Sequence, residues 1–324
     1  MLVREPAAIA VGSSESSIGF ERERELSMPG LPAREAGRIR KAGRMSAKPG
    51  MQPLAGLPLE ARSRIVGVLA DIDDTITSEG RLTAAAYTAL ERLHAAGIKV
   101  IPVTGRPAGW CDHIARMWPV DAVVGENGAF WMRYDAQAGR LKTVFVGHPP
   151  ADRQARIETL AAEILAAVPG CALASDQFCR IADLAIDFCE DVAPLPAAAV
   201  DAIVQRMEAA GMRAKVSSIH VNGWFGDYDK LSTTQRLLAE EFGIALENAT
   251  QREHWIFVGD SPNDVPMFGF FPNSVGVANV LDFVDRLEAK PAWITSARSG
   301  AGFVELAEAL LAARHAGDAH RGNP

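Results

Sequence analysis

Residues 65–75 read IVGVLADIDDT, an apolar run that ends abruptly in a cluster of acidic side chains. The apolar part has the length and the β-branched content of a buried strand, and Asp71, Asp73 and Asp74 follow at its carboxyl end. Carboxylates a few ångströms apart repel one another unless a cation holds them, and Mg²⁺ prefers oxygen ligands. The stretch therefore predicts a buried strand that ends in a functional site.

A second stretch repeats this arrangement far downstream. Residues 255–264 read WIFVGDSPND, so that Asp260, Asn263 and Asp264 follow another apolar run. In an open α/β sheet, ligands bind outside the carboxyl ends of the strands. The two acidic strand ends therefore predict one shared metal site.

Residues 71–75 have three other possible interpretations. An EF-hand loop requires Gly at its sixth position and Glu at its twelfth, where this chain has Ile76 and Leu82. The acidic motif of terpene cyclases lies on helices, whereas the run before Asp71 favours a strand. An ordinary strand-to-helix turn, in which Asp73 or Thr75 caps a helix, stays open on this stretch alone.

Four short motifs follow one another along the chain. They are DIDDT at residues 71–75, TGR at residues 104–106, Lys230 at the start of a predicted helix, and GDSPND at residues 259–264. In this order they resemble the motifs of the haloacid dehalogenase (HAD) superfamily of phosphotransferases, over about residues 63–312. The resemblance implies an α/β fold, with a Rossmann-like parallel-sheet HAD core and an inserted α/β cap domain. The cap is of the larger type (IIB) found in Cof-like, sucrose-phosphatase-like and mannosyl-3-phosphoglycerate-phosphatase-like proteins.

Each motif offers residue types that phosphoryl transfer requires. Asp71 is the candidate nucleophile, because a carboxylate can attack phosphorus and divide hydrolysis into two easier steps. Asp73 lies on the same side of an extended chain and can protonate the leaving alcohol. Thr104, Gly105 and Lys230 offer a hydroxyl, a free amide and a cation for the charge of the transferring group.

The remaining candidates surround this centre. Mg²⁺ is expected to bind Asp71, the main-chain carbonyl of Asp73 and Asp260, with Asn263 and Asp264 in or near its coordination shell. Zinc is disfavoured, because neither Cys nor His accompanies these acids. The residues expected to bind substrate are Thr75, Gly105, Arg106 and Asn127.

Some positions leave more than one interpretation open. Asp74 stands where many relatives carry Gly, so its side chain must point away from the phosphate. His220 and Asn222 can contact substrate where the cap rejoins the core, although a lone His on a strand is usually structural. Asp176 and Arg180 can hold a sugar hydroxyl or a second anion, with a solvated surface the expected alternative.

Length and composition limit the class of protein. The chain has 324 residues, 48% of them hydrophobic, and a formal net charge of −7 without a visible basic stripe. Nucleic acid is therefore not an expected partner, and no apolar run is long enough to span a membrane. The four cysteines form no CxxC pair, which favours free thiols in the cytoplasm. A monomer or a small homo-oligomer is expected.

The composition of the first part of the chain differs from the rest. It is rich in Arg, Glu, Ser, Gly and Pro without a core-forming pattern, so that disorder is expected and a chain that begins at Met51 should keep its stability and activity. The expected parts are a disordered N-terminal extension at residues 1–62, a core at 63–148 and 223–314, a cap at 149–222, and a flexible tail at 315–324.

Hydrophobic periodicity and turn residues predict the elements. The expected helices cover residues 82–96, 108–118, 151–168, 196–211, 229–242, 264–271 and 302–313. The expected strands cover residues 65–70, 98–103, 122–124, 129–134, 141–146, 180–188, 213–221, 255–258, 274–277 and 292–295.

The expected function is that of a Mg²⁺-dependent phosphomonoesterase, which hydrolyses a small phosphorylated metabolite through an aspartyl-phosphate. A sugar phosphate is the expected substrate by resemblance only. The alternatives are a phosphosugar mutase of the same fold and a non-catalytic regulator that binds a phosphorylated metabolite. An acid at Asp73 argues against the regulator, because binding alone does not require it.

Overall fold

A parallel sheet forms the core. Its six strands are, in order, β1 (Gln52–Pro53), β13 (Trp293–Ile294), β12 (Ser274–Gly276), β11 (Trp255–Gly259), β2 (Gly67–Ala70) and β3 (Lys99–Pro102). The computed structural model describes residues 51–147 and 150–321, and the rest of the expected N-terminal extension lies outside the described residues. Because β2 and β11 are neighbours, the two acidic stretches follow adjacent strands, as the sequence predicts.

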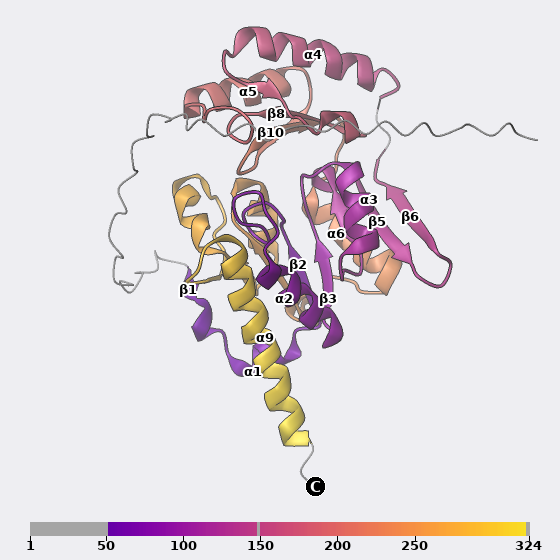
Figure 1. The fold of residues 1–324 in the computed structure, drawn as a ribbon, viewed down its shortest axis with the longest axis vertical. Helices are drawn as coiled ribbons and strands as arrows, with labels where there is room; N and C mark the ends of the chain where they lie inside the picture. The colour runs from indigo at the N-terminus through magenta and orange to yellow at the C-terminus, as the bar shows by residue number, and fades with distance from the viewer. Residues whose placement is uncertain (1–50, 148–149, 322–324) are drawn as a thin grey trace, which may run out of the picture. The chain divides into compact units, whose positions relative to one another are not determined.

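Helices cover both faces of this sheet. Side chains alternate along a strand, so that Val68 and Leu69 of β2 belong to different apolar clusters. The Val68 cluster contains leucines of α2 (Ala84–Ala95) and α9 (Ser299–Arg321), which lie side by side in Figure 1. The Leu69 cluster contains Leu237 of α6 (Lys230–Phe242) and Met267 of α8 (Val265–Phe270).

The helices next to the motifs begin and end at recognisable caps. The Thr83 side chain accepts the N–H of Ala86 at the start of α2. At the start of α6, Asp229 and Ser232 form a reciprocal capping box, and Gly243 ends the helix with φ of +67°. Such caps satisfy N–H and C=O groups that a helix end leaves free. They explain why both helices are predictable from the sequence.

The expected disorder over residues 1–62 is wrong for residues 51–62. These residues form β1, the turn η1 (Leu54–Gly56) and the beginning of α1 (Leu59–Arg64). Met51, Leu54 and Leu57 are buried in the core, and β1 pairs in parallel with β13 at the edge of the sheet. A strand of two residues is too short to show an alternating pattern.

The expected flexible tail is also corrected in part. The last helix, expected over residues 302–313, is α9, which continues through Arg321, and only residues 322–324 lie outside the described residues. The added segment contains two Ala and two Arg residues, which favour helix, beside Gly317 and Asp318, which do not. The small and polar residues at this end of the chain therefore did not indicate an absence of helix.

An antiparallel hairpin follows the second motif, as predicted. β4 (Val123–Gly125) pairs with β5 (Phe130–Asp135), which pairs with β6 (Arg140–Phe145). The short turn η2 (Glu126–Gly128) joins β4 to β5, and α3 (Ala108–Met117) packs on the hairpin. A bridge between Val103 and Val124 connects β4 to the chain just before Thr104.

The cap is an antiparallel sheet with two helices on one face. Its strands are, in order, β7 (Ala172–Leu173), β8 (Asp183–Asp187), β10 (His220–Trp224) and β9 (Arg213–Val216). α4 (Arg153–Ala167) and α5 (Ala197–Ala209) bury Leu184, Ile186 and Val221, and Figure 1 shows both helices on the same side of β8 and β10. The alternate residues of β8 and β10 face the other way.

The strands of the cap differ from the expected ones in two places. The single strand expected over residues 213–221 is two strands, because Ser217 Oγ accepts the N–H groups of Ile219 and His220 and turns the chain. β10 therefore runs on to Trp224, past the expected cap boundary at residue 222. The strand expected over residues 180–188 begins only at Asp183, after the turn η3 (Gln177–Cys179).

Three further elements complete the described chain, and the sequence pattern indicated none of them separately. They are α7 (Ala249–Glu253), η4 (Pro262–Asp264) and η5 (Ala278–Arg286). Of the helices within residues 51–147 and 150–321, none is both long enough and apolar enough to cross a membrane.

Candidate active site

The ends of β2 and β11 bring the first and fourth motifs together. Asp71 follows β2, and its N–H donates to Val258 O of β11 at 2.9 Å. Lys230 Nζ, at the start of α6, donates to Asp71 Oδ1 at 2.9 Å and to Asp264 Oδ1 at 2.8 Å. All three side chains are buried. The ammonium group of Lys230, the third motif, therefore connects the first motif to the fourth.

Three carboxylates form a compact oxygen cluster. One oxygen each of Asp71, Asp260 and Asp264 lies within 4.8 Å of the others. Burial raises the pKa of Asp71 to about 7, against the charge of Lys230, and raises that of Asp260 well above its usual range, with Asp71 adding to the effect. One lysine does not balance three acids. A hard divalent cation fits this oxygen-only donor set.

The fourth motif is held by bonds within its own loop. Asp264 Oδ2 accepts the N–H of Asp260 at 3.0 Å and that of Ser261 at 3.4 Å, and Asn263 Oδ1 accepts from Ser261 Oγ at 2.8 Å. Asp264 therefore orients the loop while it pairs with Lys230.

Asn279 is a residue that sequence reasoning missed. Its Nδ2 donates to Asp260 Oδ2 at 3.0 Å and to Asp74 O at 2.9 Å, so it ties the first motif to the fourth. It lies in η5, outside every motif, and no local pattern marks it. The structure also shows that Asp74 has φ of +54°, a conformation that Gly adopts without strain, which explains the Gly expected there.

Asp73 and Arg106 form a close pair, although they were expected in different roles. Arg106 Nε lies 2.9 and 3.0 Å from the two carboxylate oxygens of Asp73. The guanidinium also bonds Glu190 Oε1 at 2.7 Å and Asp176 Oδ2 at 3.4 Å, both from the cap. Its other face stacks on Trp110 at 4.4 Å. Arg106 thus orients the candidate acid and contacts the cap.

Thr104, expected to be catalytic, and the remaining residues expected to bind substrate lie around this centre. Thr104 Oγ1 accepts the N–H of Arg106 at 3.0 Å, and Thr75 Oγ1 donates to Asp260 Oδ1 at 3.4 Å. Asn127 packs on Gly105, and its buried Nδ2 has no hydrogen-bond partner among the residues that the structure describes. Of these residues, only Gly105 lines the central cavity. Thr75, Thr104 and Asn127 brace the loops around it.

A small cavity separates core from cap at this point. Its volume is about 10 Å³, which is room for about one water molecule. Its lining residues are Asp71, Asp73, Gly105, Arg106 and Asn263 from the core and Ser217, Ile219, His220 and Asn222 from the cap. The interpretation of His220 and Asn222 as possible contact residues therefore agrees with their position.

The cap residues Asp176 and Arg180 do not lie on a solvated surface, and that expectation is wrong. Both are buried, and Arg180 pairs with Asp176 at 2.9 Å and with Asp183 at 3.0 Å. Glu190, which no motif indicated, accepts from Arg106 and lies 2.9 Å from His220 Nε2. A network of charged groups therefore joins the cap to the second motif.

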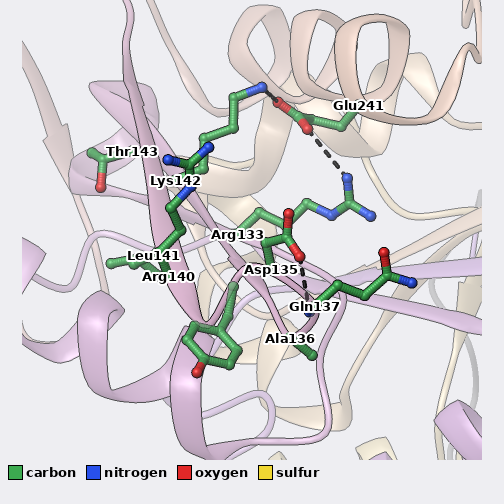
Figure 2. A pocket seen from close by; sticks show the side chains of 10 residues that line it. Arg133, Asp135, Ala136, Gln137, Arg140, Leu141, Lys142, Thr143 and Glu241 are labelled. Atoms are coloured by element: carbon green, nitrogen blue, oxygen red, sulfur yellow. Dashed lines mark hydrogen bonds and ion pairs between the residues drawn. The ribbon is translucent and has the colours of Figure 1, made fainter.

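A larger hollow than this cavity lies elsewhere, on the β5–β6 hairpin. It encloses about 900 Å³, and Figure 2 shows Arg133 and Lys142 directed at Glu241 of α6. Glu241 accepts from Lys142 at 2.6 Å and from Arg133 at 3.3 Å. None of the motif residues lines this hollow, so the chemistry is assigned to the smaller cavity.

Comparisons with known proteins agree with this geometry. A family model described as haloacid dehalogenase-like hydrolase matches residues 68–141, which include the first two motifs. No curated protein sequence matches the chain significantly.

Solved structures resemble this one over most of the chain. The C-terminal domain of C. albicans trehalose-6-phosphate phosphatase is 12% identical, with a TM-score of 0.60 over 81% of this chain and 98% of that one. A HAD/COF-like hydrolase from Plasmodium vivax is 16% identical, with a TM-score of 0.57 over 79% and 99%. A HAD subclass IIB sugar phosphatase is 15% identical, with a TM-score of 0.52 over 78% and 98%.

These likenesses extend through the inserted cap as well as the parallel core. Identities this low show the fold alone, and the family model matches only residues 68–141, which include the first two motifs. Together they show that this chain has a fold like that of capped haloacid dehalogenase-like hydrolases, and that residues 68–141 match the model of that family.

Proposed function

We propose that this protein is a Mg²⁺-dependent phosphomonoesterase that acts through an aspartyl-phosphate on Asp71. The observation that carries the proposal is that Asp71 and Asp73 line one cavity, while Lys230 donates to Asp71 and Asp260 shares its oxygen cluster, although these residues are up to 189 residues apart in the sequence. A nucleophile, an acid, a cation and a metal-binding carboxylate are what phosphoryl transfer requires.

The residues divide the reaction into two steps. In the first, an Asp71 oxygen forms a bond to phosphorus as the bond to the leaving alcohol breaks, and Asp73 gives that alcohol a proton. In the second, Asp73 takes a proton from water, the water oxygen attacks phosphorus, and inorganic phosphate and free Asp71 result. Arg106 orients Asp73 for both steps through its two-oxygen contact.

The charge of the transferring group requires stabilisation throughout. Lys230 is fixed between Asp71 and Asp264, so its charge is positioned before substrate arrives. The free N–H donor of Asn127 lies against Gly105, whose loop faces the cavity. Asp71 and Asp260, with Asp264, Asn263 and the carbonyl of Asp73 nearby, would hold Mg²⁺, which supplies Lewis-acid stabilisation when bound.

A sugar phosphate is the proposed substrate class. The cap presents Ser217, His220 and Asn222 to the cavity, groups that donate and accept hydrogen bonds as sugar hydroxyls require. Two of the structures with this fold are a sugar phosphatase and a trehalose-6-phosphate phosphatase by name. Because the cavity holds about 10 Å³, the cap must withdraw before a sugar phosphate enters.

The experiment is a phosphate-release assay of the purified chain with Mg²⁺ over sugar, polyol and nucleotide monophosphates. Release of inorganic phosphate from sugar phosphates, absent in Asp71→Asn, is expected. Movement of the phosphoryl group to another hydroxyl, dependent on a bisphosphate activator, would instead identify a mutase. Binding without turnover by the wild-type chain would identify a regulator and refute the proposal.

A further inference from the structure

Glu126 is a buried carboxylate of the core that is hydrogen-bonded to the cap. This contact is separate from the two segments in which the chain itself crosses between core and cap. The oxygens of Glu126 accept four backbone N–H groups. One is that of Ala108 at the start of α3, at 3.0 Å, and the others are those of Ile181, Ala182 and Asp183, at 2.9, 2.6 and 3.0 Å. A side chain of the core therefore holds the backbone that leads into β8.

These bonds lie at the end of the cap sheet where the chain crosses between cap and core. Asp183, the first residue of β8, is paired with Trp224, the last residue of β10 before the return crossing. Ile181 and Ala182 line one pocket with residues of both crossings, among them Val146 and Tyr228. Glu126 thus holds the hinge end of the cap.

The opposite end of the same strand reaches the active-site cavity. Asp187, the last residue of β8, pairs with His220, which lines the cavity and lies 2.9 Å from Glu190. Substrate admission requires this end to move, because the cavity is too small for a phosphate ester. One end of β8 is therefore bonded to Glu126, and the other lies near the ion pair between Glu190 and Arg106.

Glu126 is also bonded to the loop of the second motif. Its own N–H donates to Arg106 O at 3.1 Å, and the N–H of Asn127 donates to Thr104 O at 3.0 Å. From the cap, Arg180 Nη1 donates to Gly105 O at 2.9 Å. Hydrogen bonds from Glu126 and Asn127 in the core and from Arg180 in the cap therefore hold the loop 104–106 next to the hinge end of the cap.

The backbone here takes a conformation that side chains seldom adopt. φ is +43° at Glu126 and +54° at Asn127, both in the left-handed region that favours Gly. Strain of this kind persists only where the surroundings fix it, and it gathers at functional sites. The N–H bonds around Glu126 supply that constraint.

The charge of Glu126 is costly at this position. Burial, with the charge of Asp183 adding, raises the pKa of Glu126 to about 7, while the N–H of Ile181 and the charge of Arg180 act against the rise. An apolar residue would avoid the cost of a buried charge but would leave these four N–H groups without an acceptor. Only a carboxylate offers two oxygens without a hydrogen, and four N–H groups require that.

We propose that Glu126 is a positioning residue, the fixed pivot about which the cap opens and closes, and that it keeps loop 104–106 in register with the cap. The effect on catalysis rests on the proposed function, whereas the pivot itself does not. Opening withdraws His220 and Asn222 from the cavity while Ile181–Asp183 stay bound to Glu126. Closure then restores the contacts of Arg106 with Glu190 and Asp176.

Amide hydrogen exchange of the full chain tests the anchor. In Glu126→Gln the amide N–H₂ faces N–H donors, so exchange at residues 181–183 should accelerate about tenfold or more, while residues 256–258 of β11 keep their protection. Glu208→Gln, which changes an exposed carboxylate of α5, is the matched control and should change neither. Unchanged exchange at 181–183, or an equal acceleration in β11, would overturn the proposal.

Exchange with and without Mg²⁺ and orthovanadate tests the pivot. Protection is expected to rise at residues 217–222, which close over the anion, and to stay the same at residues 181–183. An equal rise in both segments would mean that Glu126 closes with the ligand, and no change in either would mean that the cap does not move. Both results contradict a fixed pivot.

Kinetics test the link to the reaction. The kcat/KM for glucose 6-phosphate, divided by that for p-nitrophenyl phosphate, should fall about tenfold in Glu126→Gln, because only the sugar ester depends on cap alignment. Glu126→Asp, which keeps the carboxylate, should recover part of the ratio. A proportional loss for both esters that follows the melting temperature would leave Glu126 a structural residue only. If the wild-type chain hydrolyses neither ester, the proposed function fails, while the ligand-free exchange of Glu126→Gln and Glu208→Gln still decides whether Glu126 anchors the cap.

Discussion

Two neighbouring acids in the first motif differ in their partners, and this difference separates their proposed roles. Asp71 contacts Lys230 and shares the oxygen cluster with Asp260, an environment that favours attack on phosphorus. Asp73 contacts Arg106 instead and faces the cavity toward the cap, where the leaving group departs. The spacing of two residues is visible in the sequence, but the two partners are not.

Substitution of each acid by its amide separates the two roles. Asp71→Asn should abolish turnover of every ester, because the nucleophile is lost. Asp73→Asn should slow alkyl phosphates by about 10²–10⁴-fold and p-nitrophenyl phosphate far less, because that leaving group needs no proton. Steady-state kcat for both ester types, with circular dichroism as a control for folding, checks this. A tenth of wild-type kcat in Asp71→Asn, a loss of only about 1.4 kcal/mol, would exclude covalent catalysis by Asp71.

Arg180 illustrates how burial changes the expected effect of a substitution. Arg180→Ala removes the partner of two buried carboxylates, Asp176 and Asp183, and should lower the free energy of unfolding by about 3 kcal/mol or more. Arg116→Ala is the matched control, because Arg116 forms an exposed pair with Asp112 on α3 and should cost less than about 1 kcal/mol. Urea unfolding measures both. Equal costs would mean that the buried network adds no stability.

At the scale of elements, local signals decide what the sequence can predict. β2 and β11 are continuous apolar runs. α2 and α6 are long enough to show a helical period, and they begin at capping residues. The positions of these elements therefore follow from the sequence itself. β1 and β13 have two residues each, and they are defined by pairing with neighbouring strands, β1 with β13 and β13 also with β12. The turn at Ser217 depends on one hydroxyl, which a run of apolar and polar letters does not reveal.

The residues of the candidate site also fall into those that local sequence signals predict and those that they do not. The motif residues were predictable because they lie at strand ends or at a helix start. Glu126, Glu190 and Asn279 were not, because each acts on a segment distant in sequence. Such partners are fixed by the tertiary arrangement and leave no local pattern.

The first described residues offer a test at the level of elements. A chain that begins at Met51 keeps β1 and α1, so its stability and kcat should match those of the full chain. A chain that begins at Ser63 lacks β1 and the buried Met51, Leu54 and Leu57. Each such side chain stabilises by about 1.5–3 kcal/mol, so this chain should unfold at a much lower urea concentration. A loss of activity in the first chain, or full stability in the second, would contradict this role of the segment.

At the scale of the whole molecule, the site exists only when distant parts of the chain meet. Asp71 and Asp260 come from opposite ends of the core sequence, and the insert between them supplies the cap that covers their cavity. Stability and activity are therefore linked at two places: the oxygen cluster in the core, and the charged contacts of Arg106 with the cap. A measurement of stability can test each of these two places.

Mg²⁺ should stabilise the folded chain by mass action. Three close carboxylates with one lysine are held at a cost, and a ligand present at 100 times its Kd adds about 2.7 kcal/mol of stability. The melting temperature should rise with Mg²⁺, and EDTA should remove activity reversibly. Ca²⁺ should bind but support little turnover, because its coordination is larger and looser. Undiminished turnover in EDTA together with an unchanged melting temperature would refute the metal site.

Glu190 makes the contact between cap and core dependent on acid pH. Burial acts to raise the pKa of Glu190, but hydrogen bonds from His220 and Arg106 outweigh it and lower the pKa to about 2. A lowered pKa stabilises the folded chain above the ordinary value for Glu, and this contribution disappears as the pH falls from that value through about 2.

Glu190→Gln, which cannot ionise, isolates this contribution. It should be less stable than the wild-type chain by a constant amount between about pH 6 and 8, and the difference should shrink below about pH 4.5. Arg106, Asp176 and His220, which belong to the same network, are present in both chains, so the two chains differ only in the carboxylate of residue 190. Urea unfolding at each pH gives the two curves. A difference that stays constant down to pH 3, or that grows as the pH falls, would mean that the ionised Glu190 does not hold the cap to Arg106.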